Sequence, residues 1–203
     1  MKIAVIGASG QAGSRITAEL ARRGHTVTAI ARHPENIAAL PHVTAVAGDA
    51  QDRAGLTRLL AGQDVAVSSV RFLDSDPERL IGAVRDAGVG RYLVVGGAGS
   101  LEVAPGVRLV TTADFPAAYK PEAEKGAAFL DRLAQEKELN WSFLSPSALF
   151  TVGDRTGRFR LGGDRLLTDP DGKSWISFED FAVALADEIE RPAHVRQRFT
   201  VGY

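Results

Sequence analysis

The glycine-rich segment Gly7–Gly13, which reads GASGQAG, constrains the fold of this 203-residue chain more than any other feature. It lies between a short apolar run, Lys2–Ile6, and a pattern with helical spacing that begins at Gln11 and stops near Gly24. Glycine at every third position between a strand and a helix is typical of a turn that holds a diphosphate. We therefore predict a dinucleotide site here, and a glycine-tolerant surface loop is the alternative.

The glycines of this turn have separate expected roles. Gly7 permits the tight exit from the strand, Gly10 lets a diphosphate approach the backbone, and Gly13 lets the helix pack closely on the sheet. The intervening residues contribute backbone N–H groups at the positive end of the helix dipole. The predicted cofactor-binding residues of the turn are Gly7, Ala8, Ser9, Gly10, Gln11, Ala12 and Gly13.

Short strand-like runs alternate with longer helical patterns along the whole chain. This alternation predicts an α/β protein with a Rossmann-like, doubly wound parallel sheet. The runs are mostly unbroken Val, Ile, Ala and Leu, as expected for strands covered on both faces. Strands are predicted at Lys2–Ile6, Thr26–Ala31, Val43–Ala47, Asp64–Val70, Arg91–Val95 and Trp141–Leu144. Helices are predicted at Gln11–Arg23, around Leu56–Leu60 and Leu80–Val84, and from near Pro121 through Leu133.

The length suits one domain, so residues 1–203 are interpreted as a single NAD(P)-binding domain. Residues 151–203 are too few for a second domain, and we expect them to form a small extension or flap on the substrate side. Its predicted parts are short strands near Gly157–Leu161 and Arg165–Thr168, a helix started by a capping box at Ser177–Asp180, and a final strand at Arg198–Val201.

Composition excludes several function classes. Lys and Arg number 24 against 25 Asp and Glu, without a basic cluster, so a nucleic-acid partner is not expected. The chain has no cysteine, and its four histidines are scattered, so no metal site is expected. The N-terminal apolar run is far too short for a signal peptide or a membrane span. We therefore expect a cytoplasmic protein that does not bind membranes.

The residues after the second predicted strand bear on the choice of nucleotide. NAD-selective folds place an acidic residue there to bond the ribose 2′-hydroxyl, whereas the segment VTAIARHPEN (27–36) offers Arg32. A guanidinium pairs well with a 2′-phosphate, so Arg32 favours NADP(H), with NAD(H) as the alternative. A solvated arginine at the end of a strand is the purely structural interpretation.

The G-x-x-G-x-x-G spacing resembles that of the atypical short-chain dehydrogenase/reductase group. Within that group the chain is similar, over nearly its whole length, to small NAD(P)H-binding proteins of the NADH-flavin reductase-like family. A more distant similarity is to biliverdin reductase B and to NmrA-like redox sensors. The segments that carry the likeness are Gly7–Gly13, Gly48-Asp49, VVGGAGSLEV (94–103), WSFLSPSALF (141–150) and DGKSWISFEDFAVALADEIE (171–190).

Further cofactor-binding residues follow from the resemblance. It implies that Asp49, with Ala50 beside it, accepts the adenine amino group; the alternative is an N-cap for the helix beginning near Asp52. It also implies that the backbone at Ser68 and Ser69 lies along the ribose-phosphate, whereas a satisfied hydroxyl at the end of a strand is the alternative.

Ligands of open α/β sheets bind at the carboxyl ends of the strands, which points to two further segments. The small residues Gly96 and Gly97 would let a flat nicotinamide or substrate lie close to the backbone. Ser145 and Pro146 would run beside the nicotinamide, and a proline turn at the end of a strand is the alternative. The candidate catalytic residues are Ser100, as a hydroxyl toward a substrate carbonyl or as a turn cap, and Tyr119, as a cover over the nicotinamide or as a packed aromatic.

The usual acid of the superfamily, a tyrosine followed by lysine four residues later, is missing. The residue four positions after Tyr92 is Gly96, and the residue four positions after Tyr119 is Ala123. Tyr203 is the last residue of the chain. Reducing a carbonyl to an alcohol needs a proton donor that the protein positions. Reducing a flavin or quinone depends much less on such a donor, because solvent can protonate the product.

The sequence therefore predicts an NADPH-dependent reductase of a small aromatic or conjugated acceptor such as a flavin or quinone, acting as a monomer or homodimer. The alternatives are a non-catalytic NADP(H)-binding redox sensor and an NAD(P)-dependent epimerase or dehydratase. The last needs a larger substrate lobe than residues 151–203 provide.

Overall fold

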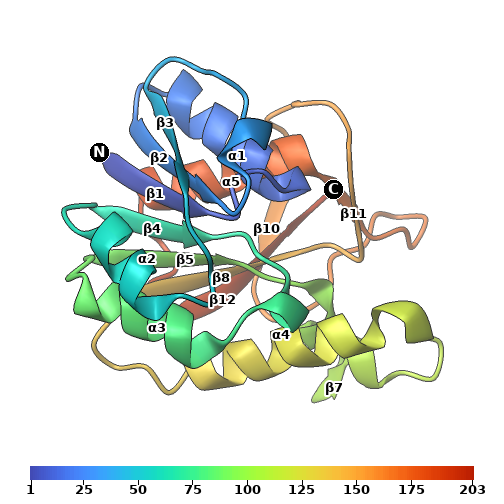
Figure 1. The fold of residues 1–203 in the computed structure, drawn as a ribbon. Helices are drawn as coiled ribbons and strands as arrows, with labels where there is room; N and C mark the ends of the chain where they lie inside the picture. The colour runs from blue at the N-terminus through green and yellow to red at the C-terminus, as the bar shows by residue number, and fades with distance from the viewer.

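An eight-stranded sheet forms the centre of the molecule in the computed structural model, which describes residues 1–203 (Figure 1). Neighbouring strands pair in parallel except for the antiparallel pair β10–β12 at one edge. In spatial order the strands are β10 (Arg160–Gly162), β12 (Gln197–Gly202), β8 (Asn140–Pro146), β5 (Arg91–Val95), β4 (Val65–Ser68), β1 (Lys2–Ile6), β2 (Thr26–Ala31) and β3 (Val43–Ala47).

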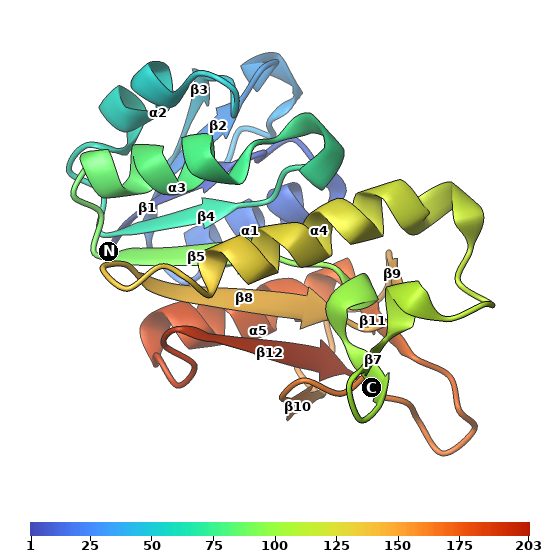
Figure 2. The ribbon, with the colours of Figure 1, turned by 90° about the horizontal axis from the view of Figure 1, so that it is seen from below.

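Helices cover both faces of the sheet, as Figure 2 shows. One face carries α1 (Gln11–Arg22) and α5 (Phe178–Glu190), and its core contains buried residues of both helices. The other face carries α2 (Arg53–Leu60), α3 (Pro77–Asp86) and α4 (Lys120–Leu133), which build a second core. Strands with both faces buried explain the unbroken apolar runs in the sequence.

The chain reverses its direction across the sheet at β1. This strand pairs with β2 on one side and with β4 on the other, so successive crossovers build outward in opposite directions. Such a reversal opens a crevice at the carboxyl ends of the strands. The glycine turn follows β1 at this point, which confirms the predicted Rossmann-like, doubly wound sheet.

Several predicted elements agree with the structure, and two do not. The bounds of β1, β2, β3 and β5 are those predicted, and Arg198–Val201 lies within β12. The strand expected at Arg165–Thr168 is wrong, because Arg165 makes only an isolated bridge to Glu102. The strand expected near Gly157–Leu161 is shifted to β10, because the Gly157 N–H is tied into a turn by the Asp180 carboxylate.

The predicted capping box at the start of α5 is half confirmed. The Ser177 hydroxyl accepts a hydrogen bond from the Asp180 N–H at 3.0 Å, as a capping residue does. The Asp180 carboxylate is fully buried and turns to the loop and the chain end instead, where Thr156 and Tyr203 donate their hydroxyls to it. The buried acid therefore fastens Thr156, Gly157 and the C-terminal residue to α5.

Additional short elements were not predicted. They are 3-10 turns, termed η, and two small two-stranded sheets that pair β6 with β7 and β9 with β11. Their bounds are η1 (Pro34–Asn36), η2 (Phe72–Asp74), η3 (Ala98–Ser100), β6 (Glu102–Ala104), β7 (Val107–Arg108), η4 (Leu109–Thr111), η5 (Ala117–Tyr119), β9 (Leu149–Thr151) and β11 (Trp175–Ser177). None of the helices combines the length and apolarity that crossing a bilayer requires.

A buried carboxylate joins α1 to the C-terminal segment. Glu19 is 5% exposed and accepts hydrogen bonds from the guanidinium groups of Arg22, Arg23 and Arg155. Burial alone would raise the pKa of Glu19, but the three arginines outweigh it and hold the pKa far below its ordinary value of 4.5. The ionised form of Glu19 therefore stabilises the folded chain.

We expect this carboxylate to make stability depend on pH. Because its pKa is lowered on folding, its stabilisation is complete above about pH 5 and is lost as the pH falls through its folded-state pKa. Glu19→Gln should lower the free energy of unfolding by about 1–3 kcal/mol at pH 7. Urea unfolding at pH 7 and pH 3 tests this: the gap between parent and variant should narrow in acid, and a gap independent of pH would contradict it.

Candidate nucleotide and acceptor site

A cavity of about 230 Å³ lies at the carboxyl ends of β1, β2, β3 and β4, beside the glycine turn. It contains the predicted cofactor residues Gly7, Ser9, Gly10, Arg32, Asp49, Ala50 and Ser69. The other predicted residues of the turn, Ala8, Gln11, Ala12 and Gly13, lie in the chain just outside its lining. This first cavity is small, and glycines and polar or charged residues make up most of its lining, which suits the phosphate and ribose part of a nucleotide.

The glycines of the turn are held by close backbone approaches. Gly7 has a φ of +84°, and a Cβ there would lie 2.2 Å from the Ser69 carbonyl oxygen. A Cβ on Gly13 would lie 2.1 Å from the Gly7 carbonyl oxygen, so Gly13 allows α1 to pack against the turn. Gly10 is different, because its nearest such contact is 3.3 Å and it lines the first cavity. Its missing side chain therefore leaves room for a ligand.

The N-terminus of α1 has no side-chain cap and no acidic residue in its first turn. By contrast, Asp52, Asp76 and Ser177 cap α2, α3 and α5 with their side chains. The first N–H groups of α1 therefore stay available beside the first cavity, at the positive end of the helix dipole.

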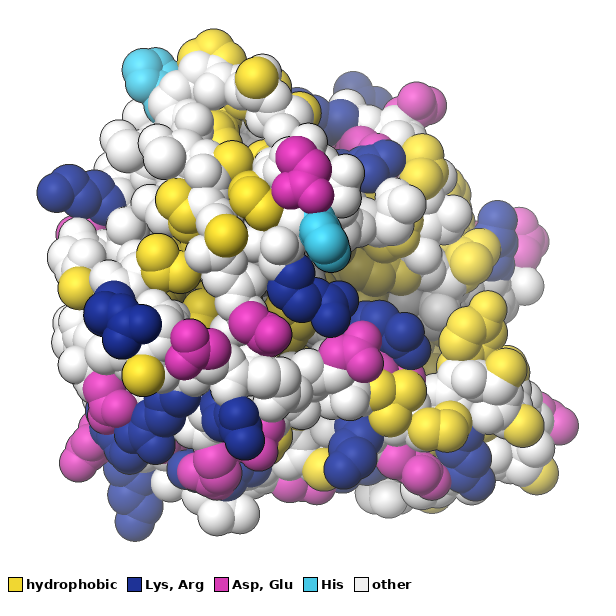
Figure 3. Space-filling model, in the orientation of Figure 1, with side chains coloured by type: hydrophobic (Ala, Val, Ile, Leu, Met, Phe, Trp, Pro, Cys, Tyr) yellow, Lys and Arg dark blue, Asp and Glu magenta, His cyan; other side chains and the backbone are white.

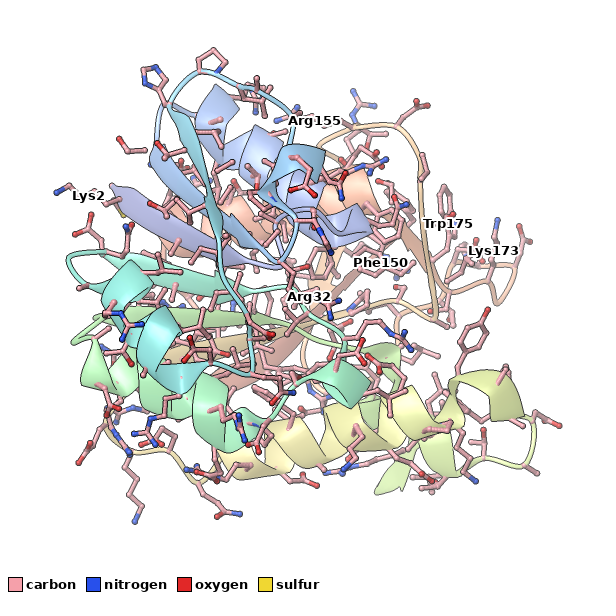
Figure 4. All side chains as sticks on the ribbon, viewed as in Figure 1. Lys2, Arg32, Phe150, Arg155, Lys173 and Trp175 are labelled. Atoms are coloured by element: carbon pink, nitrogen blue, oxygen red, sulfur yellow. The ribbon has the colours of Figure 1, made fainter.

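Two arginines line the first cavity. Arg32, directly after β2, is exposed and makes no ion pair or side-chain hydrogen bond within the chain. Arg71 follows β4, is 68% exposed, and reaches Asp74 only at 3.9 Å. Figure 3 shows basic side chains gathered at the edge of a hollow on this face, and Figure 4 labels Arg32 there. Both arginines are positioned to meet an anionic group in the cavity.

Asp49 lies in the wall of the first cavity and does not cap a helix. Its carboxylate accepts a hydrogen bond from the Gln51 N–H at 2.8 Å, and the residue that caps α2 is Asp52. The N-cap alternative for Asp49 is therefore wrong. Asp49 retains acceptor capacity for a nucleotide base, because an ionised carboxylate has about four lone-pair sites.

Ser68 and Ser69 differ in accessibility. Ser68 is 2% exposed, and its hydroxyl is hydrogen bonded to that of Tyr92 at 2.8 Å, so its side chain faces the core. Ser69 lines the first cavity, and its N–H bonds the Ile6 carbonyl in continuation of the sheet. The satisfied hydroxyl considered as an alternative is therefore what the structure has at Ser68.

A second cavity of about 550 Å³ lies on the other side of the segment after β4, where Arg71 lines the first cavity and Phe72 the second. It contains the predicted residues Gly96, Gly97, Ser100, Tyr119 and Pro146. Its remaining lining is Phe72, Ala98, Gly99, Leu109, Thr112, Asp114, Phe115, Pro116, Glu122, Ala123, Gly126, Ala127, Ser147, Ala148 and Phe150. Nonpolar surface predominates there, which suits a flat aromatic ring.

Four hydroxyl-bearing residues line the second cavity, and one of them, Thr112, donates its hydroxyl to the Leu109 carbonyl. Ser100 is 3% exposed, and the Arg198 guanidinium donates to its carbonyl oxygen at 3.1 Å and approaches its hydroxyl at 3.4 Å. Tyr119 is 69% exposed on η5 at the cavity wall. Ser147 donates its hydroxyl to the Val201 carbonyl. Tyr119 is therefore the tyrosine at this site, and no lysine lines the cavity with it.

The other two tyrosines have structural surroundings. Tyr92 is fully buried, and this burial raises the pKa of its hydroxyl well above the ordinary value. Burial also raises the pKa of Tyr203, whose hydroxyl donates to Asp180. Neither tyrosine lines the second cavity.

The segment that closes the second cavity was not predicted. Phe150 is the last residue of the chain that lines the second cavity, so residues 151–203 do not form its wall. Residues of η4, η5 and α4 form that wall instead. Figure 2 shows this segment beside the carboxyl end of β8. Ser145 is fully buried on β8 and lines neither cavity. Pro146 lines the second cavity. Residues 151–203 do not reach the second cavity because α5 packs in the core and β12 pairs within the main sheet.

Sequence reasoning missed Arg71, Phe72, Asp114 and Glu122. Arg71 had a usable signal, because it closely follows a predicted strand next to the glycine turn in the sheet order. The other three had none. Phe72 and Glu122 are brought to the cavity by the contact between η2 and α4, and Asp114 by the fold of the chain between β5 and α4.

The fold and the glycine turn at the switch point define a Rossmann-type nucleotide-binding protein. A family comparison agrees: the profile of the NAD(P)H-binding family matches residues 7–192, and the chain belongs to that family.

Solved structures with the same fold carry different names. A protein from Burkholderia pseudomallei, provisionally named an exported protein, is 46% identical with a TM-score of 0.91, covering 100% of both chains. A provisionally named epimerase from Bacteroides thetaiotaomicron is 41% identical with a TM-score of 0.95, covering 100% of this chain and 96% of its own. A provisionally named NADH-flavin reductase from Streptococcus pneumoniae is 35% identical with a TM-score of 0.84, covering 100% and 99%. The resemblance stated from the sequence is thereby confirmed.

Proposed function

We propose that the chain is an NADPH-dependent reductase of planar conjugated acceptors such as quinones or flavins. One observation carries the proposal: a small cavity lined by glycines and two arginines adjoins a larger, mainly apolar cavity that has a tyrosine and no lysine in its lining. The name of the Streptococcus pneumoniae relative, an NADH-flavin reductase, supports a flavin as acceptor but gives NADH as the nucleotide.

The residues of the first cavity fit a nicotinamide nucleotide. The uncapped N–H groups of α1 and the open space at Gly10 suit a diphosphate. The exposed, unpaired guanidinium of Arg32 suits a 2′-phosphate, and Asp49 suits the adenine amino group. When bound, the reduced nicotinamide supplies a hydride, which is a proton with two electrons.

The chain's own contribution to the reaction is orientation. Gly97 leaves the floor of the second cavity free of a side chain, because a Cβ there would meet open space, whereas a Cβ on Gly96 would collide with the buried Phe143 ring. Phe72 and Phe150 form apolar walls for a flat ring. The acceptor gains the hydride and one further proton, and solvent can deliver that proton to a quinone or flavin product. A lysine-assisted tyrosine is therefore not needed for these acceptors, and Tyr119 serves as a wall.

The direct test is turnover. Purified protein is incubated with NADPH and separate quinones, flavins and simple ketones, and the absorbance of reduced nicotinamide is followed. We expect quinone or flavin reduction and no ketone reduction. Tight NADPH binding without reduction of any acceptor would contradict the proposal and favour a redox sensor.

Nucleotide preference is tested at Arg32. A charge-assisted hydrogen bond to the 2′-phosphate contributes about 1.5–3 kcal/mol, so Arg32→Ala should weaken NADPH binding about 10- to 150-fold. NADH binding should change little, because NADH lacks that phosphate. The two dissociation constants are measured by calorimetry, and an unchanged ratio between them would exclude this role of Arg32.

A further inference from the structure

We infer that the second cavity selects acceptors without negative charge, an inference that rests on the proposed reductase function. Of the residues that line this cavity, two are carboxylates, Asp114 and Glu122, and none is a lysine, arginine or histidine. An acceptor in the cavity therefore meets acidic groups with no cation in the wall to balance a charge of its own.

The two carboxylates differ in how far they are compensated. Glu122 accepts hydrogen bonds from the N–H groups of Phe72 at 2.7 Å and Leu73 at 2.9 Å, and so fastens η2 to α4. Asp114, in the loop between η4 and η5, is exposed and has no hydrogen bond or ion pair on its side chain. Asp114 is therefore the uncompensated charge at the cavity.

One arginine, Arg198, is hydrogen bonded to a residue of this wall, but it already forms an ion pair. Arg198 donates to the Ser100 carbonyl, but its guanidinium also pairs with Asp164 at 2.6 Å and its side chain is 9% exposed. The free arginines, Arg32 and Arg71, line the first cavity. The two cavities thus differ in their cations: the lining of the first contains two arginines beside the carboxylates of Asp49 and Asp74, whereas the lining of the second contains carboxylates and no cation.

A like charge brought next to an uncompensated carboxylate is repelled, and an anion also loses hydration on entering an apolar cavity. A neutral quinone pays neither cost. The matched probes are 2-methyl-1,4-naphthoquinone, which is neutral, and 1,4-naphthoquinone-2-sulfonate, which has the same ring system and one negative charge. The electron-withdrawing sulfonate makes its ring the stronger oxidant, so slower reduction of it cannot reflect weaker chemistry.

With NADPH, we expect kcat/KM for the sulfonate to be lower than for the neutral quinone by about tenfold or more. Calorimetry with protein saturated with 1,4,5,6-tetrahydro-NADP gives a second readout, because the ring of this analogue is uncharged, like that of NADPH, and cannot give up a hydride. The neutral quinone should bind more tightly by a similar factor. Added salt should narrow the difference through screening.

Asp114→Asn should raise kcat/KM for the sulfonate relative to that for the neutral quinone, by about threefold to tenfold. The control is Glu124→Gln, which changes the net charge equally. Glu124 is exposed on α4 and does not line the cavity, so this variant should keep the parental ratio.

Equal reduction and equal affinity for the two probes would overturn the charge selection and leave the reductase function standing. An equal effect of Glu124→Gln and Asp114→Asn would also overturn it, because the effect would then follow overall charge. If neither quinone is reduced although NADPH binds, the reductase function fails and the inference fails with it.

Discussion

Gly10→Asp is expected to abolish nucleotide binding while leaving the fold at least as stable as the parent. Gly10 is the N-cap of α1 with extended backbone and no side-chain cap, so aspartate there would bond a free helix N–H and gain a few tenths of a kcal/mol. The same carboxylate would meet the diphosphate and should weaken NADPH binding by more than about a hundredfold. Thermal unfolding and calorimetry measure the two effects separately.

Gly13→Ala is the matched control, because the same turn should respond in the opposite way. The new methyl group would lie 2.1 Å from the Gly7 carbonyl oxygen, which is backbone and cannot rotate away. We expect unfolding free energy to fall by about 1–3 kcal/mol, as for an overpacked core. If Gly10→Asp instead lost stability and kept nucleotide affinity, the turn would be structural only.

The second large effect is expected at the amino end of β5, away from the two cavities. Arg91, the first residue of β5, pairs with Glu188 of α5 at 2.7 Å, and their side chains are 10% and 3% exposed. Glu188 also accepts the His194 N–H at 2.9 Å. Glu188→Gln leaves a buried guanidinium without its counter-charge and should cost about 3–5 kcal/mol of stability. Urea unfolding at pH 7 measures this loss.

Asp86→Asn provides the comparison, because Asp86 forms an ion pair of the same type with Arg53 at 2.6 Å on the surface. Exposed pairs contribute little, so we expect a loss below about 1 kcal/mol. NADPH affinity of the folded Glu188→Gln protein should match that of the parent, because the pair lies at the amino ends of the strands. A loss at Glu188 no larger than that at Asp86 would show that the buried pair does not hold α5 to the sheet.

The sequence predicted those parts of the fold that depend on local pattern. The strands β1, β2 and β5 are largely buried, so their apolar runs stand out and their bounds are correct. The bounds of β3 are also correct, although it is an edge strand without a buried residue. The glycine turn was predicted for a similar reason, because Gly7 and Gly13 meet a steric requirement that few other residues satisfy.

The wall of the second cavity could not be predicted, because distant contacts shape it. Glu122 fastens α4 to residues about fifty positions earlier, and Arg108 bridges to Asp131 at 2.6 Å. Neither contact leaves a periodic pattern in the sequence. The contacts of Asp180 could not be predicted either. Its position three residues after Ser177 suggested a helix cap, but its carboxylate accepts hydrogen bonds from Thr156 and Tyr203.

The central claim is that the N-terminal end of α1 and the turn before it hold the diphosphate of NADPH. A crystal structure of the protein with NADP⁺ tests it most directly. The account predicts the diphosphate against the backbone of residues 8–13 and the 2′-phosphate beside Arg32. A nucleotide bound at another edge of the sheet, or absent at saturating concentration, would contradict the account.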